Sequence, residues 1–299
     1  MEKLEPMTPY DVAPEQRKWT ESGWWKVLKS SKLGLLSLIL LLFVTVVAVF
    51  APAIAPYDPY TQNALNRMQP SSAEHWLGTD HFGRDILSRI IYGARVSLVV
   101  GFFSVLFSSV IGTLLGMIAG YKGGRFDDIL MRLVESIMSI PVLLLGLMLL
   151  VALGSKVTTV IIALSIGFIP SCARLARGST LEVKEKEFVK AAITNGAGTM
   201  RILFMHILPN IISPVLVIST LHMGSAIRVE ASLSFLGMGI QPPTPTWGNM
   251  IRDSMNFLTT ASWVAIYPGV ALMLVVIAFN LLGDTLRDAL DPHQVRKRT

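Results

Sequence analysis

The residue types that could carry chemistry are few in this chain, and none falls in a catalytic spacing. The single cysteine, Cys172, excludes an intrachain disulfide and is expected to pack as a small apolar side chain. The sequence has no phosphate-binding G-x-x-x-x-G-K-[ST] loop, no zinc-binding H-E-x-x-H pair and no G-x-S-x-G nucleophile turn. We therefore expect no enzyme activity, no cofactor and no metal site. The histidines also lack a metal-ligand spacing: His75, His81, His206, His222 and His293.

Two pairs of charged residues have a spacing that indicates contact with each other. Asp80 and Arg84 are four residues apart, as are Asp85 and Arg89. On a helix each pair would share a face and stabilise it by a few tenths of a kcal/mol. Such a helix would lie solvated on the outer membrane face or would help to receive a partner protein.

Arg228 and Glu230 lie where an apolar stretch ends. Ionisable groups are costly inside a membrane unless they are paired or hydrated. Because residues two apart do not face each other on a helix, the two side chains are expected to have separate partners. Two interpretations stay open. Both groups line a substrate path, or the helix ends near Ile227 and both reach interfacial water.

The elements that must position these residues are membrane helices. With 52% hydrophobic and 15% charged residues and a mean hydropathy of +0.56, the chain has more apolar surface than a soluble domain buries. A membrane-spanning helix needs roughly 20 residues. We expect an all-α polytopic protein with six transmembrane helices. Six stretches lack Asp, Glu, Lys and Arg: 33–57, 96–121, 136–155, 157–173, 202–227 and 254–283.

The positions of the basic residues predict the orientation. Six spans place both termini on one side, and short cytoplasmic loops are enriched in Lys and Arg. A cytoplasmic N-terminus leaves few of the 26 Lys and Arg outside: Arg67, Arg84, Arg89, Arg95, Lys156, Arg228 and Arg252. This topology explains the pI near 9.5. Nucleic-acid binding is not expected, because no basic stripe carries interleaved aromatic residues.

The expected topology divides the chain into segments. Residues 1–32 form a cytoplasmic tail, where tryptophans among basic residues indicate a short helix at the membrane surface, with a disordered tail as the alternative. The apolar run that follows is too long for a signal peptide and predicts the first span. The segments are 33–57 for the first transmembrane helix, 58–95 for an extracytoplasmic loop, 96–283 for a core of five transmembrane helices, and 284–299 for a cytoplasmic tail.

A polar helix-turn-helix pattern interrupts the core at 183–208. Good helix formers at 183–192 are followed by Asn195 and Gly196, which resemble a helix C-cap and turn. A second helix is expected from Thr199, an N-cap candidate, towards Leu208, before Pro209 starts the next span. A soluble partner could bury the apolar surface of this pair, or the pair could pack on its own bundle. The apolar residues are Phe188, Ile193, Met200, Leu203 and Phe204.

This loop resembles the cytoplasmic coupling loop of importer-type ABC permeases, which has two alanines, a glycine one turn later and an Ile-Leu-Pro step. Lys190 stands where that family often has glutamate. Four further segments resemble the second membrane subunit of dipeptide, oligopeptide and nickel systems, and the match covers most of the chain. They are IAPYDP at 54–59, LGTDHFGRDILSRIIYGARVSL at 77–98, EASLSFLGMGIQPPTPTWG at 230–248 and NLLGDTLRDALDP at 280–292.

The resemblance implies an ABC importer type I permease fold and a set of partners. These are a second permease subunit in a heterodimer, two ATP-binding cassette subunits that hold ATP and Mg²⁺, an extracytoplasmic solute-binding protein and membrane lipid. It also implies which residues couple the chain to the ATPase: Phe188, Lys190, Ala191, Ala192, Gly196, Ile207, Leu208 and Pro209.

The implied function is ATP-driven import of di- and oligopeptides by alternating access, across the plasma membrane of a bacterium or archaeon. Import of nickel or a metal chelate is the alternative. A self-sufficient secondary carrier is less expected, because the spans are nearly free of ionisable groups. An intramembrane enzyme would need buried acidic pairs or a metal-ligand set, and the sequence shows neither.

Overall fold

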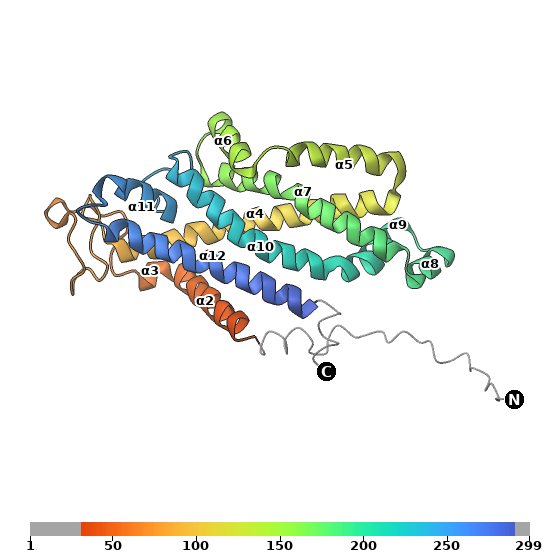
Figure 1. Cartoon of the computed structure of the whole chain (residues 1–299), viewed down its shortest axis with the longest axis horizontal. Coiled ribbons are helices and arrows are strands. Elements are labelled where there is room, and N and C mark those ends of the chain that lie inside the picture. Colours follow the sequence, from red (N-terminus) through yellow and green to blue (C-terminus); the bar gives the residue numbers. More distant parts are fainter. Residues whose placement is uncertain (1–30, 291–299) are drawn as a thin grey trace.

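The computed structural model describes residues 31–290, and its elements in that range are helices (Figure 1). Apart from one isolated β-bridge between Thr79 and Asp85, this part of the chain has no strand pairing. The prediction of an all-α membrane protein is confirmed. The helices are α2 (Lys32–Val49), α3 (Ala51–Ile54), η1 (Ala64–Asn66), α4 (Ile86–Lys122), α5 (Gly124–Met138), α6 (Val142–Leu153), α7 (Val157–Lys184), α8 (Glu187–Thr194), α9 (Thr199–Arg201), the π-helix η2 (Ile202–Ile207), α10 (Leu208–Phe235), α11 (Trp247–Ser254), η3 (Met255–Phe257) and α12 (Trp263–Leu290).

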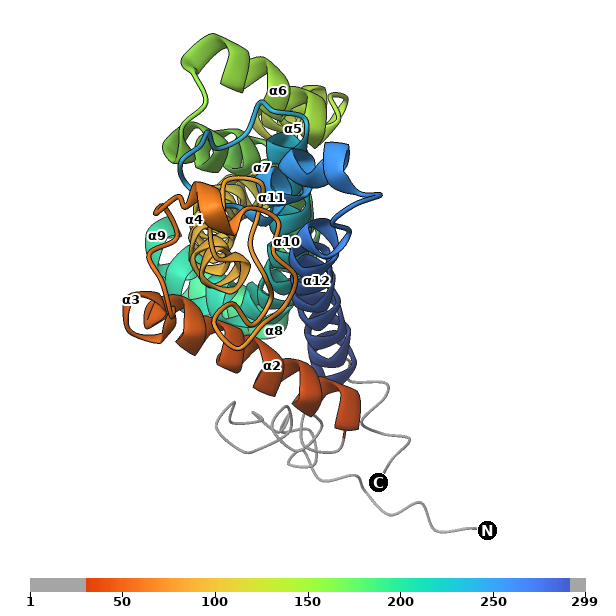
Figure 2. The same cartoon turned by 90° about the vertical axis from the view of Figure 1, so that its left-hand side faces the viewer.

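The long helices run side by side in one elongated bundle. Helices α4, α7 and α10 lie in the middle, with α2 and α12 on one side and α5 and α6 on the other (Figures 1 and 2). Helices α8 and α9 lie at one end, towards which the start of α2 and the end of α12 point (Figure 1). The opposite end, which we call the outer end, holds α3, the loop at 55–85 and α11 (Figure 1).

The centre of the bundle depends on close approach between α4 and α7. Glycines at every fourth position of α4 face α7, and a Cβ at Gly116 would overlap the carbonyl oxygen of Ala173. Small residues let two helix backbones approach closely, so that many van der Waals contacts form where no water drives association. Cys172 is fully buried against Gly112 in this seam, which confirms its expected packing role.

The predicted third span at 136–155 is wrong as a single straight helix. Helices α5 and α6 form a bent pair with an angle of 83° between them. The break falls before Pro141, since proline cannot donate to the helix ladder and disfavours helical backbone in the preceding residue. Within residues 31–290 five helices are long and apolar enough to cross a membrane, and the count reaches six if the bent pair is one span.

Other predicted boundaries also shift. Helix α4 begins ten residues earlier than the charge-free stretch at 96–121, because Asp85 caps it. Helix α7 extends to Lys184, and α10 continues past Ile227 to Phe235. Each of these helices continues past the charged residue that ends its charge-free stretch. A charged side chain does not end a helix when it can reach a polar partner. The predicted surface helix in the tail at 1–32 lies outside the described residues, as does most of the tail at 284–299.

Candidate functional site

The predicted coupling loop at 183–208 projects from the end of the bundle opposite the outer end (Figure 1). The first helix of the predicted pair is α8, which starts at Glu187, since Val183 and Lys184 still belong to α7. An acidic residue in the first turn suits the positive end of the helix dipole. Gly196 then turns the chain with a φ of +78°, as predicted, and nothing lies within 4 Å of where its Cβ would be.

The second predicted helix, 199–208, is not a separate element. Gly198, not Thr199, is the N-cap of α9, and the chain passes through η2 directly into α10. The reason for the π-helix lies at Pro209, because a proline lacks an N–H and its ring crowds the carbonyl four residues earlier. The backbone widens so that Leu208 donates to Leu203, and the Asn210 side chain donates to the His206 carbonyl at 2.6 Å.

A small apolar cluster fastens the loop to the bundle. Val189 of α8 is fully buried among Ile202 and Ile207 of η2, Met117 of α4 and Ala176 of α7. A displacement of α8 would therefore also move the ends of α4, α7 and α10 that lie opposite the outer end. Apolar burial of this kind is worth about 25 cal/mol per Å² removed from water.

The structure separates the predicted coupling residues into two groups. Phe188, which is 43% exposed, and Lys190, Ala191, Gly196 and Pro209 lie on the surface. Ala192 and Leu208 are half-buried and Ile207 is fully buried, so Ile207 anchors the loop. The exposed apolar surface also includes Ile193, Met200, Phe204 and Met205.

The charged residues of the loop are solvated. Lys190 contacts Glu185 at 3.1 Å and Lys186 contacts Glu182 at 3.2 Å, with all four side chains exposed. Exposed ion pairs contribute little to stability, so these charges are available to a partner.

An ion pair that the sequence did not reveal fixes α5 to α7. The Arg177 guanidinium donates from Nε and Nη2 to the two carboxylate oxygens of Asp127, each at 2.6 Å. Two parallel bonds of this kind fix orientation as well as distance. A separate bond joins α7 to α4, because Lys184 Nζ donates to the Gly120 carbonyl at 3.0 Å. The 50 residues between Arg177 and Asp127 hid the pair, and only the amphipathic pattern of 124–138 hinted at a docked helix.

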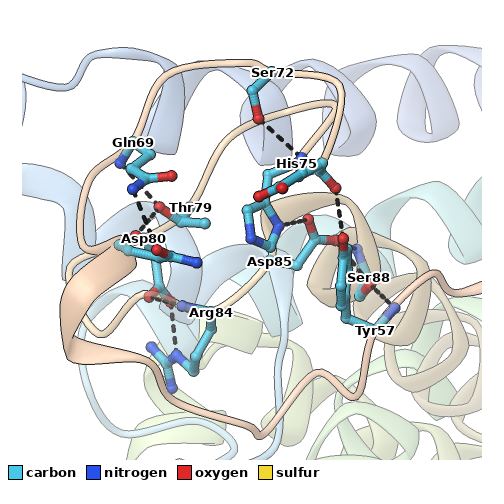
Figure 3. A network of polar contacts seen from close by, with 11 residues as sticks. Tyr57, Gln69, Ser72, His75, Thr79, Asp80, Arg84, Asp85 and Ser88 are labelled. Carbon is cyan, nitrogen blue, oxygen red and sulfur yellow. Dashed lines mark hydrogen bonds and ion pairs between the residues drawn. The ribbon is translucent and has the colours of Figure 1, made fainter.

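At the outer end, the loop at 55–85 folds into a buried polar network (Figure 3). Asp85 caps α4 by accepting from the backbone N–H and the hydroxyl of Ser88, both at 2.8 Å, and it contacts His75 Nδ1 at 2.9 Å. The Tyr57 N–H donates to Ser88 Oγ, and the Gln69 N–H donates to Thr79 Oγ1. These bonds tie the start of the loop to the start of α4.

The predicted surface helix and the pair of Asp85 with Arg89 are wrong, whereas the pair of Asp80 with Arg84 forms. Asp80 and Arg84 do contact at 2.7 Å, but across a tight turn. Arg89 contacts Asp80 at 3.6 Å, and Asp85 is occupied with capping. All four side chains are buried, which excludes the solvated surface helix. Burial lowers the pKa of the neighbouring His81.

Arg228 and Glu230 have opposite environments. Arg228 is exposed, and Glu230 has no exposed surface, because α10 continues beyond both. The expectation of separate partners agrees with this arrangement, and the expectation that both reach interfacial water is wrong for Glu230. A role on the substrate path stays a prediction for both residues. The Glu230 carboxylate accepts hydrogen bonds from two hydroxyl groups.

Comparisons with known proteins agree with this architecture. Residues 112–296 match the family model described as the inner membrane component of binding-protein-dependent transport systems, and residues 21–70 match the N-terminal transmembrane domain of oligopeptide transport permease C. The chain belongs to this family of transport-system membrane components. It is a non-catalytic permease subunit of an ABC importer.

Individual relatives align over nearly the whole chain. The dipeptide transport system permease protein DppC of Alkalihalophilus pseudofirmus is 43% identical, over 95% of this chain and 94% of the relative. The glutathione transport system permease protein GsiD of Escherichia coli O157:H7 is 42% identical, over 94% of this chain and 93% of the relative. An inward-facing structure of the MetNI methionine ABC transporter shares the fold, with a TM-score of 0.57 and 20% identity over 69% of this chain and 98% of that one.

The orientation of the bundle is open to a labelling test. We expect a cysteine in place of Ser72 to react with an impermeant thiol reagent in intact cells, and one in place of Thr194 to react only after permeabilisation. Both positions are exposed, and Cys172 is fully buried, so Cys172→Ala provides a silent background. The reverse pattern, with Thr194 labelled and Ser72 protected in intact cells, would invert the predicted topology.

Proposed function

We propose that this chain is one of two different permease subunits of an ABC importer for di- and oligopeptides, in the inner membrane, with both termini cytoplasmic. The observation that carries the proposal is the 43% identity to a dipeptide permease over 95% of the chain. The named relatives include dipeptide and glutathione permeases, so nickel or a metal chelate is not the favoured cargo.

The exposed apolar side chains of the 183–208 loop indicate a binding surface for a partner subunit. Phe188, Ile193 and Met200 project from the 183–208 loop beside solvated charges, and clustered apolar side chains in water mark a protein interface. We assign this surface to one ATP-binding cassette subunit, which holds ATP and Mg²⁺. The second permease contributes the other half of the path and docks the second ATPase subunit. An extracytoplasmic binding protein delivers the cargo to the outer end.

The bundle suits transmission of force along its axis. Residues 199–235 form one continuous helical segment of 37 residues, from α9 through η2 to the end of α10. At a rise of about 1.5 Å per residue it is about 55 Å long. A movement of the 183–208 loop, driven by closure of the ATPase subunits, would reach the outer end along this helix and reverse access to the path.

The division of labour can be measured directly. The purified chain alone is expected to hydrolyse no ATP above background, because it lacks a phosphate-binding loop. The complex with its ATPase subunits and second permease, in proteoliposomes, is expected to accumulate peptide when peptide-loaded binding protein and ATP are present. ATP turnover by the chain after removal of all other subunits, or a complete complex that ignores peptide, would refute this assignment.

A further inference from the structure

Glu230 is a fully buried carboxylate, with 0% of its surface exposed, and it forms no ion pair within residues 31–290. Its partners are hydroxyl groups. Ser234 Oγ donates to Oε1 at 2.8 Å, and Ser97 Oγ donates to Oε2 at 3.1 Å. A carboxylate without a cation is costly to bury, so the position requires an explanation.

The hydroxyl groups belong to two different helices. Ser97 is in α4, and Ser234 is in α10 one turn beyond Glu230. Ser234 Oγ in turn accepts from the backbone N–H of Ile240 at 3.3 Å. A carboxylate offers about four acceptor sites, so one group can bind donors from several helices at once. Glu230 therefore joins α4 to α10 and is linked, through Ser234, to Ile240 of the segment that follows α10.

That segment, residues 236–254, forms a hairpin-like excursion at the outer end, which we call the outer hairpin. Its other contacts fix it to α4, to α10 and to the turn between α6 and α7. Trp247 Nε1 donates to the Ile90 carbonyl of α4 at 3.1 Å, and a Cβ on Gly248 would overlap the Ala231 carbonyl of α10. Ser155 Oγ donates to the Met238 carbonyl at 2.8 Å. Its tip is exposed at Gln241, Pro242 and Pro243.

We propose that Glu230 is a positioning residue that locks the outer hairpin to α4 and α10, so that movement of the 183–208 loop repositions the hairpin. The inference rests on the proposed import function, and it adds the residue through which the outer hairpin is attached to α4 and α10. Helix α10 joins the two ends, with the loop anchored at Ile207 and the hairpin attached at Glu230. Glu230 touches no cargo in this scheme. Its loss should separate ATP hydrolysis from transport while the permease still assembles.

The first test measures the hairpin in the whole purified complex by amide hydrogen exchange. In Glu230→Gln, which keeps the side-chain size, we expect exchange in the peptide containing 237–246 to rise about tenfold to a hundredfold, as when hydrogen bonds to a charged group are lost. Ser97→Ala removes the α4 partner alone and should give a smaller rise. Ser108→Ala is the matched control, because that buried α4 hydroxyl bonds only its own helix, at Val105.

The second test measures peptide taken up per ATP hydrolysed in proteoliposomes, using a labelled dipeptide and its loaded binding protein. We expect Glu230→Gln to assemble and to lose about fivefold or more in this ratio, the lower end of typical coupling between sites. Ser108→Ala should match the wild type. The double variant Glu230→Gln/Ser97→Ala should be no worse than Glu230→Gln, because both changes break one junction.

The outcomes separate the two proposals. Unchanged exchange at 237–246 in Glu230→Gln overturns the locking role, whatever the transport result. Raised exchange with an unchanged ratio of peptide to ATP overturns the coupling role. A wild-type complex that transports no peptide refutes the proposed function, while the exchange measurement still decides whether Glu230 holds the hairpin.

Discussion

Asp80→Ala is expected to prevent stable accumulation of the protein in the membrane. The Asp80 carboxylate accepts from Arg84 Nε at 2.7 Å and contacts Arg89 Nε at 3.6 Å, and it also accepts from the backbone N–H groups of Phe82 and Arg84. Without it, two buried guanidinium groups lose the carboxylate that they contact. Removing one partner of a buried ion pair costs roughly 3–5 kcal/mol, a large fraction of the usual stability of a domain.

The matched control is Glu74→Ala, which removes the same charge from an exposed position in the same loop. Surface substitutions of this kind change stability by about 0.5 kcal/mol or less. Membrane-inserted protein measured by immunoblot, together with the melting temperature of the purified complex, should separate the two variants clearly. If Asp80→Ala accumulates and melts like Glu74→Ala, the buried network at the outer end does not stabilise the fold.

Gly196→Asp is expected to leave insertion intact and to abolish coupling between ATP hydrolysis and transport. The backbone at this position has a φ of +78°, which side chains other than glycine adopt at a cost of roughly 1–3 kcal/mol. The new carboxylate would also project from the surface that we assign to the ATPase subunit. Since 1–3 kcal/mol corresponds to roughly 5–150-fold in an equilibrium, docking that requires this turn should weaken by about fivefold or more.

Gly198→Asp separates the two causes. It adds the same side chain two residues away, where φ is −68° and nothing lies within 4 Å of the new Cβ. Aspartate also suits this N-cap position. The measurements are co-purification of the ATPase subunits and the stimulation of ATP hydrolysis by loaded binding protein. Full transport and normal stimulation in Gly196→Asp would show that 183–208 is not the coupling surface.

Much of the architecture was readable from local sequence because membrane insertion is a local property. A run of about 20 residues without charge predicts a spanning helix whatever lies around it. The turn at Gly196 was predictable for the same reason, since a positive φ is a property of one residue. The helix-turn-helix pattern and the order of the four resembling segments likewise required no knowledge of the folded chain.

The ionic contacts were not readable in this way, because they depend on how distant segments meet. The four-residue spacing of Asp85 and Arg89 suggested a pair. In the folded loop the Asp85 carboxylate instead contacts Ser88 and His75. The bond between Arg177 and Asp127 joins residues 50 apart, and sequence spacing carries no information at that range. The break between α5 and α6 had a visible signal in Pro141, but its angle of 83° is set by packing.

The contrast is clearest at Arg228 and Glu230. The sequence by itself determined that two ionisable groups stand at the outer end of a spanning helix and that they cannot share a partner, because a helix turns residues two apart to different faces. Only the tertiary structure decided that Arg228 is exposed and that Glu230 is enclosed by Ser97 and Ser234. Helical periodicity sets the angle between neighbouring side chains. Which face is buried depends on how α4 and α11 pack against α10, and the spacing of the two residues says nothing about that packing.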